Sequence, residues 1–323
     1  MMCTFLNRRG RQTYFVVPTG DCIHLKALIT GGAGFIGSHL VDALMNQGWA
    51  VAAIDNLSSG KLQNIQHWLN HHRFELVRTD LRKPHAKWES HFKDVNVVLH
   101  FAANPEVRTS AVCPRTHFEE NILATFNVLE AARLNDWKQF VFASSSTVYG
   151  EAKVTPTPED YQPLKPISIY GMAKLASEKM LETYADLYDI KATILRYANV
   201  VGPRIAQSVI VDFLQKLRAN PSTLEILGDG RQTKSYLYIE DAVSATLHAT
   251  NKGLQSNDKV EVYNVGSEDQ IKVVEIADMI VKEMRLKNVE YRFQPATTDG
   301  RGWLGDVKNM LLDITKLKKT GWH

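Results

Sequence analysis

The chain has 323 residues, 44% of them hydrophobic, enough to bury a full core as one large α/β domain or as a domain with a smaller satellite. A formal charge of only +3 argues against a nucleic-acid surface, and no apolar run approaches the ~18 residues of a membrane span. We therefore expect a small-molecule ligand, with neither nucleic acid nor membrane as a partner. The 3 cysteines have no disulfide-like or metal-like spacing, so no metal is expected and a reducing cytoplasm fits best.

Residues 1–24 fit the rest of the chain poorly. Their apolar run, residues 14–17, ends at Pro18 and is far shorter than the roughly 7 to 15 residues of an export signal. We expect this segment to be an N-terminal tail outside the folded domains.

A strand, a glycine-rich turn and a helix follow one another directly after the tail. Residues 26–30 predict a buried strand, and residues 35–47 predict an amphipathic helix. Glycines between them let the backbone approach a pyrophosphate at the helix N-terminus, where amide groups and the helix dipole favour an anion. This context makes a dinucleotide site credible, although the Gly-x-x-Gly-x-x-Gly spacing differs from the commonest dehydrogenase fingerprint. The expected cofactor contacts are Gly31, Gly34, Phe35, Ile36 and Gly37.

The next two predicted strands end in carboxylates. Residues 51–55 end in Asp55, which can accept both hydroxyls of the adenosine ribose and repels a 2′-phosphate, so NAD is favoured over NADP. Residues 74–80 lead to Asp80 and Leu81, placed to meet the adenine edge, with a strand-end cap as the alternative for Asp80. The loop after Asp55 adds the expected contacts Asn56, Ser58, Ser59 and Gly60.

Residues 95–103 form a nearly continuous apolar run, which is typical of a central parallel strand covered on both faces. His100 within it is interpreted as a satisfied core residue rather than a catalytic one. Small residues at the end of the run leave room for the cofactor. A helix is predicted over 115–135. The expected cofactor contacts in these two segments are Phe101, Ala102, Ala103 and Asn121.

A predicted strand at 139–143 runs into a hydroxyl-rich segment, residues 144–150. Open α/β sheets bind ligands at the carboxyl ends of their strands, and hydroxyl groups there can both donate to and accept from a sugar alcohol. Strand-end capping is the alternative for these side chains.

The spacing Tyr-x-x-x-Lys occurs three times, and only one copy can be helical. The pairs that begin at Tyr149 and Tyr161 run into prolines, which exclude a regular helix. Tyr170 and Lys174 begin a proline-free stretch, and a helix predicted over 168–188 places them one turn apart.

The periodicity of this helix predicts which residues face the core. Met172 and Leu187 are expected to widen the inner face that carries Tyr170 and Lys174, whereas Glu178 is expected on the opposite, solvated face.

The strand-helix alternation breaks down after a strand predicted at 191–199, which carries Tyr197 and Asn199. Further elements are predicted at 209–220 (helix), 224–227 (strand) and 239–251 (helix). Arg231 and Lys234 fall in one loop after a glycine turn, which suggests a second phosphate group to bind, with a solvated charged loop as the alternative. Arg301 adds a cation among glycines near the end.

The ordered combination of these motifs resembles the extended short-chain dehydrogenase/reductases of the NAD-dependent epimerase/dehydratase family. It is most similar to the nucleotide-sugar 4-epimerases, in their archaeal-type branch. The resemblance covers residues 25–322 and rests on residues 31–37, 55, 80–81, 102–103, 144–150, 170 and 174, 196–204, 228–230 and 300–306.

The resemblance implies a Rossmann-type doubly wound parallel sheet with a smaller C-terminal α/β substrate-binding domain. Residues 25–200 would form the NAD-binding domain, with 236–265 returning to it in part, and 201–323 would form most of a substrate-binding lid. The implied cofactor is NAD, and Ser144, Tyr170, Lys174 and Tyr197 join its expected contacts.

The implied reaction inverts C4 of a UDP-sugar, most simply UDP-glucose and UDP-galactose, through a 4-keto sugar. Tyr170 would take the proton of the 4-hydroxyl as a phenolate while NAD takes the hydrogen on C4. Ordinary tyrosine has a pKa of ~10, and a cation within ~4 to 6 Å lowers such a value by ~1 to 3, so Lys174 is expected to lower the pKa of Tyr170. The implied catalytic residues are Ser145, Tyr170 and Lys174, and the implied substrate contacts are Ser145, Thr147, Tyr170, Asn199, Lys234 and Arg301.

Several alternatives stay open. Lys234 and Ser235 stand where relatives commonly have arginine and aspartate, and lysine lacks the bidentate fork of arginine, so the grip on the diphosphate differs. A dehydratase would usually carry an acidic pair where Ser146 and Thr147 stand. UDP-N-acetylglucosamine or UDP-glucuronate could be the substrate, or the chain could be a non-catalytic NAD-binding sensor. By analogy, a homodimer through the helices at 115–135 and 168–188 is expected.

Overall fold

A seven-stranded parallel sheet forms the centre of the computed structural model, which describes residues 5–6, 12–13, 25–83, 87–137, 139–188 and 190–323. The strand order is β13-β8-β7-β6-β3-β4-β5. The strands are β3 (Lys26–Thr30), β4 (Ala50–Asp55), β5 (Phe74–Arg78), β6 (Val97–His100), β7 (Gln139–Ser145), β8 (Lys191–Tyr197) and β13 (Val260–Val265). Because the order reverses between β3 and β6, a crevice opens at the carboxyl ends of these strands, where such sheets bind ligands. The predicted doubly wound α/β fold is confirmed.

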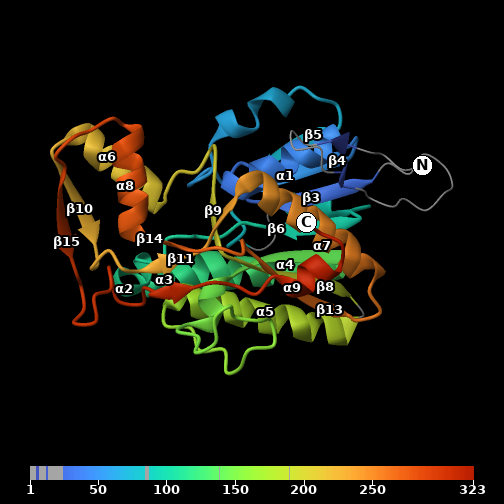
Figure 1. Ribbon diagram of the computed structural model, residues 1–323. Helices are drawn as coiled ribbons and strands as arrows, with labels where there is room; N and C mark the ends of the chain where they lie inside the picture. Colours follow the sequence, from blue (N-terminus) through green and yellow to red (C-terminus); the bar gives the residue numbers. More distant parts are fainter. Residues whose placement is uncertain (1–4, 7–11, 14–24, 84–86, 138, 189) are drawn as a thin grey trace.

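Two pairs of helices cover the two faces of this sheet (Figure 1). Helices α1 (Phe35–Asn46) and α7 (Ile239–Gln255) pack on one face, and α4 (Ala124–Leu134) and α5 (Ile169–Tyr188) pack on the other. Each face has its own apolar core, since parallel strands that are buried on both sides present hydrophobic residues in both directions.

The helix predicted over 115–135 is interrupted. Short helices α2 (Thr109–Val112) and α3 (Pro114–His117) precede a π-helical turn, η4 (Phe118–Leu123), and only then does α4 begin. The wide turn presents Asn121, which is 2% exposed, to the loop after β6. There its Oδ1 accepts the amide of Asn104 at 2.7 Å and its Nδ2 donates to the Asn104 carbonyl at 3.1 Å.

The predicted faces of α5 are partly wrong. Glu178, expected in solvent, is 0% exposed, whereas Met172 and Leu187, expected to face inward, are 41% and 68% exposed. Burial of Glu178 is possible because Arg196 of β8 pairs with it inside the protein. The helix therefore turns a polar group toward the sheet and an apolar stripe outward.

The lid is a separate lobe built from small sheets, seen at the left of Figure 1. Strands β10 (Thr223–Leu227) and β15 (Glu290–Gln294) pair in parallel, and helices α6 (Val209–Ala219) and α8 (Val273–Glu283) share a third apolar core with them. The elements that join the lid to the main sheet are β9 (Asn199–Val201), β11 (Thr233–Lys234), β12 (Tyr236–Tyr238), β14 (Ile271–Lys272) and β16 (Asn309–Met310).

The chain crosses between the two lobes more than once. Strand β13 pairs with β8 in the main sheet, and α7 packs beneath it, so residues 239–265 lie with the first lobe after the lid has begun. The remaining short helices are η1 (Leu62–Asn64), η2 (Gln66–Trp68), η3 (Lys87–Phe92), η5 (Ser146–Tyr149) and α9 (Thr315–Lys319).

Of the predicted N-terminal tail, only β1 (Phe5–Leu6) and β2 (Gln12–Thr13), which pair with each other, are described. The rest of that prediction lies outside the described residues. None of the described helices is both long enough and apolar enough to cross a membrane.

Candidate active site

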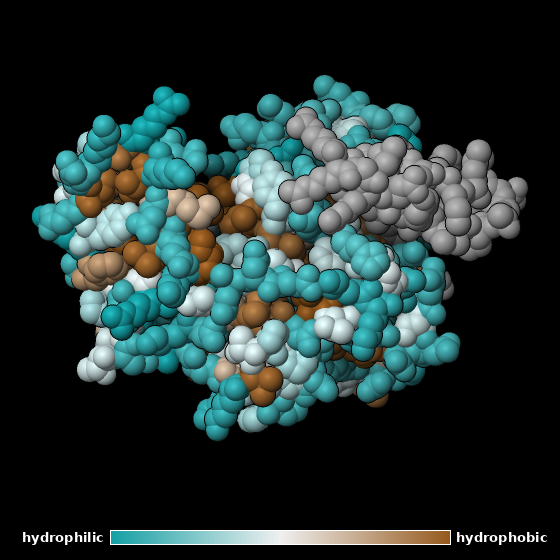
Figure 2. Space-filling model, viewed as in Figure 1, coloured by the Kyte–Doolittle hydropathy of each residue, from teal (hydrophilic) through white to brown (hydrophobic). Residues whose placement is uncertain are grey.

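Two cavities meet between the carboxyl ends of the sheet strands and the lid. The larger has a volume of about 930 Å³ and runs along the glycine turn and the ends of β4 to β7. The smaller, of about 540 Å³, lies against the lid. Figure 2 shows hydrophobic residues gathered in the hollow between the two lobes, with hydrophilic residues over most of this face. The residues common to both cavities include Glu106, Ser146, Thr147, Asn199 and Gln207.

The glycine turn fits a pyrophosphate. Gly31 has a φ of +71°, and a Cβ there would lie 2.8 Å from the backbone nitrogen of Ala102. A Cβ on Gly37 would come within 2.1 Å of the Gly31 carbonyl oxygen, so the turn packs against the start of α1 only with glycine at both positions. Helix α1 has no side-chain cap and no acidic residue in its first turn, which leaves its amide groups available to an anion.

Asp55 is held rigidly at the end of β4. Its two carboxylate oxygens accept the amides of Leu57 at 2.8 Å and Ala33 at 2.9 Å. Burial raises the pKa of Asp55, and these two hydrogen bonds act in the opposite direction. A Cβ on Gly60 would lie 2.8 Å from both carboxylate oxygens, so Gly60 packs against Asp55 and does not line the cavity itself.

Most of the predicted cofactor residues line the larger cavity. They are Gly31, Gly34, Phe35, Ile36, Gly37, Asp55, Asn56, Ser58, Ser59, Asp80, Leu81, Phe101, Ala102, Ala103, Ser144, Tyr170, Lys174 and Tyr197. Asp80 does so while bonded to Arg82, whose Nη2 lies 2.7 Å from its Oδ2. Gly60 and Asn121 do not line this cavity, and Asn121 acts instead on the loop at Asn104. These contacts fit a dinucleotide in volume and in chemistry.

Tyr170, Lys174 and Ser145 all line the larger cavity. The Nζ of Lys174 donates to the carbonyl of Ala143 at 2.7 Å and lies 5.8 Å from the centre of the Tyr170 ring. Ser145 Oγ accepts the hydroxyl of Thr147 at 3.0 Å and its amide at 3.2 Å, which leaves the Ser145 proton available to donate. Ser110 Oγ accepts the backbone amide of Tyr170 at 3.1 Å.

The pKa values of this group differ from the expectation. Burial raises the pKa of Tyr170 to about 12, and a hydrogen bond with Ser145 acts against that rise. Burial also lowers the pKa of Lys174 to about 8, while the charge of Glu178 raises it. The expected lowering of the Tyr170 pKa by Lys174 is therefore not found, because the effect of burial exceeds that of the hydrogen bond with Ser145.

A buried ion pair between Glu178 and Arg196 lies behind these residues, and the sequence did not lead us to predict it. Glu178 accepts from Arg196 Nη2 at 2.7 Å and from Nε at 3.0 Å, and it also accepts the hydroxyl of Ser144, the neighbour of Ser145. Arg196 donates further to the Tyr149 hydroxyl at 3.0 Å. Glu178 stands one turn after Lys174, at i+4, and that spacing was the signal in the sequence that could have revealed it.

His100 is a core residue, as interpreted. It is 1% exposed, with its Nδ1 2.6 Å from Thr30 Oγ1 and its Nε2 2.9 Å from Thr125 Oγ1. Burial is the main cause that lowers its pKa to about 3, so the ring is neutral at physiological pH.

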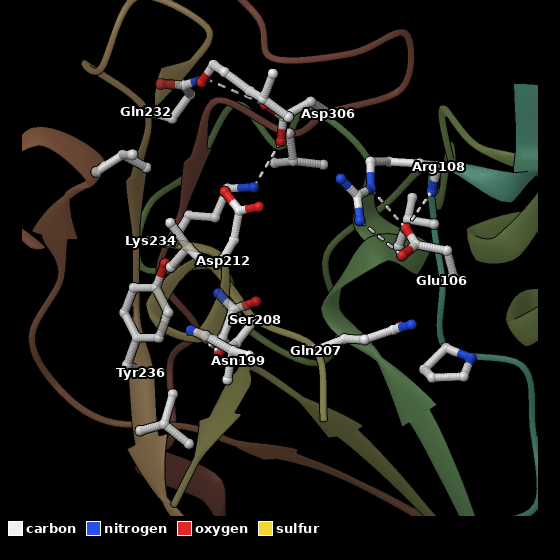
Figure 3. A pocket seen from close by; sticks show the side chains of 18 of the residues that line it. Glu106, Arg108, Asn199, Gln207, Ser208, Asp212, Gln232, Lys234, Tyr236 and Asp306 are labelled. Atoms are coloured by element: carbon white, nitrogen blue, oxygen red, sulfur yellow. Dashed lines mark hydrogen bonds and ion pairs between the residues drawn. The ribbon is translucent and has the colours of Figure 1, made fainter. Parts of the chain in front are cut away.

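Three of the predicted substrate residues, Asn199, Thr147 and Lys234, line the smaller cavity. Figure 3 shows Asn199 and Lys234 in its wall. Lys234 Nζ pairs with Asp306 Oδ1 at 2.6 Å. Arg301 lines neither cavity, because it pairs with Asp299 at 2.8 Å and with Glu151. Its proposed direct grip on the substrate thus finds no support in this geometry.

Arg231 lines neither cavity either. Two alternatives were open for the loop that carries both cations: a solvated charged loop or a loop that binds a phosphate group. Arg231 is exposed, as in the first alternative, whereas Lys234 faces the cavity, as in the second.

Comparison with known proteins decides the family. The family described as the NAD dependent epimerase/dehydratase family matches residues 27–266. The chain belongs to the NAD-dependent epimerase/dehydratase family. The resemblance drawn from the sequence motifs is thereby confirmed, and NAD is the cofactor of this family.

Individual members of the epimerase/dehydratase family are similar over nearly the whole chain. A crystal structure of a UDP-galactose 4-epimerase is 48% identical, with a TM-score of 0.81 and 93% of each chain covered. UDP-glucose 4-epimerase of Mycolicibacterium smegmatis is 33% identical over 306 residues, 93% of each chain. A Bacillus cereus UDP-glucuronic acid 4-epimerase, in complex with UDP-glucuronic acid and NAD, is 32% identical with a TM-score of 0.82, and covers 93% of this chain and 94% of its own. The protein is thus similar to UDP-sugar 4-epimerases of more than one specificity.

Proposed function

We propose that this protein inverts C4 of a UDP-sugar with NAD, and that UDP-glucose and UDP-galactose are its substrates. The observation that carries the proposal is the position of Tyr170, Ser145 and Lys174 in the wall of a dinucleotide-sized cavity, with Ser146 and Thr147, next to Ser145 in the chain, lining both this cavity and the second one against the lid. A sugar between the two cavities would have its reacting carbon beside the tyrosine and its nucleotide beneath the lid.

Each polar side chain has a role that follows from its contacts. Tyr170 removes the proton from the 4-hydroxyl and returns it, and the Ser145 hydroxyl, already oriented by Thr147, donates to the same oxygen. Lys174 supplies a positive charge on the buried side of the tyrosine ring. Bound NAD supplies the acceptor for the hydrogen on C4 and a second positive charge near Tyr170.

Tyr170 needs a second positive charge beside that of Lys174, because burial raises the pKa of its hydroxyl. A phenol with a pKa of about 12 is a poor base at neutral pH, so the reaction requires the cofactor to be in place before Tyr170 can lose its proton. Loss of the Tyr170 proton would thereby be coupled to binding of the cofactor.

Elimination of water from the sugar fits the site less well. Ser146 and Thr147 provide hydroxyls where a dehydratase needs an acid and a base, and neither can supply that chemistry. A uronate or an N-acetyl sugar remains an alternative to the neutral hexose.

The test is direct interconversion. Purified protein is incubated separately with UDP-glucose, UDP-galactose, UDP-N-acetylglucosamine and UDP-glucuronate, without added NAD and then with it, and the products are separated chromatographically. Conversion of UDP-glucose and UDP-galactose into each other, faster than any other pair, is the expected result. Faster turnover of another pair would reassign the substrate, and release of water from the sugar would contradict epimerisation.

We also propose that the protein is a homodimer through α4 and α5. The outer sides of this helical layer expose large apolar side chains, which in a monomer would face water. They are Phe118, Phe126, Leu134, Met172, Leu187 and Tyr188. Light scattering after gel filtration should give the mass of two chains, and Leu187→Glu should shift the protein to monomer, with Leu254→Glu, on α7 at the opposite face of the sheet, as the control.

A further inference from the structure

A buried histidine, His117, lies behind the proposed catalytic base and lines neither cavity. It belongs to α3, which packs against α5, the helix that carries Tyr170 (Figure 1). The residue is 0% exposed, and no step of the proposed reaction uses it. Because the charge of a histidine can change near neutral pH, its burial beside the base bears on how the site works.

The imidazole of His117 packs edge-on against the ring of Tyr170. The two ring centres are 5.7 Å apart, and the ring planes are inclined at 68°. Aromatic pairs favour this arrangement. The preceding helix, α2, holds the backbone of the same tyrosine, since Ser110 Oγ accepts the Tyr170 amide at 3.1 Å. The segment formed by α2 and α3 therefore holds Tyr170 both at its backbone and at its ring.

Asn121 determines which nitrogen of His117 carries the hydrogen. The backbone of Asn104 fixes the orientation of the Asn121 amide, because it donates to Oδ1 and accepts from Nδ2. The same Nδ2 has a second hydrogen for His117 Nδ1, which lies 3.1 Å away. Since Nδ2 can only donate, Nδ1 must accept, and the neutral ring carries its hydrogen on Nε2. Nε2 itself has no hydrogen-bond partner among the described residues.

A proton on His117 Nδ1 is incompatible with this arrangement. It would face the hydrogens of Asn121 Nδ2, and turning the Asn121 amide over would place Nδ2 against the Asn104 amide and Oδ1 against its carbonyl. Either orientation then loses hydrogen bonds that hold the backbone at Asn104. The chain continues from there to Glu106, which lines both cavities.

Burial is the main cause that lowers the pKa of His117 below the ordinary value of a histidine. Charged groups on three elements also act on the ring. Glu120 in η4 and Glu106 in the loop favour its charged form, as does the Glu106 backbone, whereas Lys174 on α5 disfavours it. An ordinary histidine has a pKa of ~6.5, so His117 is neutral at neutral pH and becomes charged only in more acidic solution.

We propose that His117 is a positioning residue for the reaction: its neutral ring fixes the ring of Tyr170 from behind and, through Asn121, the loop backbone at Asn104. Protonation of His117 in acid would release this loop and weaken binding of the UDP-sugar. The inference rests on the proposed function. It adds a residue that touches neither substrate nor cofactor and acts through the two groups that it holds.

Two substitutions separate the two contacts. His117→Phe keeps a ring against Tyr170 and removes the acceptor for Asn121, so it should raise KM for UDP-galactose about 3- to 10-fold with little change in kcat. His117→Asn places an amide oxygen near the position of Nδ1 and removes the ring. It should therefore lower kcat about 3- to 10-fold with a smaller change in KM.

His248→Gln is the matched control. His248 is a half-buried histidine on α7 whose Nε2 lies 2.8 Å from Thr320 Oγ1, burial lowers its pKa, and it lines neither cavity. Its substitution should alter neither kcat nor KM.

The pH dependence of KM gives a readout that packing alone would not move. In the unaltered protein and in His248→Gln, KM for UDP-galactose should rise as the pH falls from about 8 to about 5. The rise should be absent in His117→Phe and His117→Asn, because neither side chain takes up the proton. Nitrogen NMR of histidine-labelled protein, with His117→Asn to identify the signals of His117, should place the hydrogen on Nε2 at neutral pH.

Two results would overturn the proposal. One is KM of His117→Phe within about twofold of the unaltered protein, together with an unchanged rise of KM in acid. The other is a hydrogen on Nδ1 at neutral pH, since Asn121 could not then donate to it. If the unaltered protein converts no UDP-sugar, the proposed function fails, and the NMR signals still decide whether Asn121 holds His117 in the inferred form.

Discussion

The core behind the active site and the loop that lines the smaller cavity hold their charged residues in opposite ways. In the sheet lobe, Glu178 and Arg196 are 0% and 4% exposed in their side chains and are locked into strands and a helix. Around the smaller cavity, Arg108 and Glu106 are 52% and 25% exposed and pair within one loop. Chemistry at C4 needs groups that do not move, whereas a nucleotide that enters and leaves needs partners that exchange. Substitutions should therefore damage catalysis and stability in the core behind the active site, and affinity around the smaller cavity.

The largest effect is expected at the base. Tyr170→Phe removes the only group that contacts both Ser145 and the reacting hydroxyl in the proposed arrangement, and should lower kcat by about 10²- to 10⁴-fold. Binding of NAD and of UDP should stay the same, because the ring still fills its place. Turnover by this variant at the rate of the unaltered enzyme, measured in the interconversion assay, would refute the proposed role.

The buried pair should dominate stability. Glu178→Gln leaves Arg196 without a charged partner inside the protein, and the free energy of unfolding should fall by about 3 to 5 kcal/mol in urea titrations. Glu182→Gln is the matched control on the same helix, since its partner Lys179 is 58% exposed, and it should cost under about 1 kcal/mol. Equal losses in the two variants would mean that burial of Glu178 contributes nothing.

Glu178 should also affect the pH dependence of kcat/KM, through the pKa of Lys174. Lys174 has a pKa of about 8, so kcat/KM, which reports the free enzyme, should fall as pH rises through that value and the cation is lost. The charge of Glu178 raises this pKa, and its removal in Glu178→Gln should move the alkaline fall to lower pH. An unshifted profile, with Glu182→Gln as reference, would show that Glu178 acts only on stability.

A smaller effect is expected at the π-helical turn. Asn121→Ala removes the two hydrogen bonds that hold the backbone at Asn104, the loop that leads to Glu106 and Arg108. The unfolding free energy should drop by about 1 to 3 kcal/mol, as buried backbone groups lose their partner. The loosened loop should also raise KM for the UDP-sugar more than it lowers kcat, and a change in kcat alone would contradict this positioning role.

Local pattern was sufficient for much of the fold. The helix that carries Tyr170 and Lys174 was predicted to begin at residue 168, and it begins at Ile169. This pair could be recognised as the helical one because prolines exclude a regular helix at the other two Tyr-x-x-x-Lys spacings. The glycine turn at Gly31 could be recognised because only glycine accepts its positive φ and its close approach to Ala102. The strand predicted at 95–103 is shorter in the structure, where β6 spans Val97–His100. The apolar run shows which residues are buried, but the ends of a strand are set by its hydrogen bonds to neighbouring strands.

Long-range partners decided what pattern could not. Helical periodicity placed Glu178 in solvent, whereas its partner Arg196, which makes its burial possible, stands 18 residues away in another element. Arg301 was assigned to the substrate from the family resemblance, but it pairs with Glu151, 150 residues earlier in the chain.

The sequence by itself determined the parallel sheet, the glycine turn and the pairing of Tyr170 with Lys174, since each depends on neighbours within a few residues. Only the tertiary structure decided which charges are buried, which cations face the smaller cavity, and which way the pKa of Tyr170 shifts. Those properties depend on desolvation and on ion pairs between distant segments, and both arise only when β7, α5 and the lid are packed together.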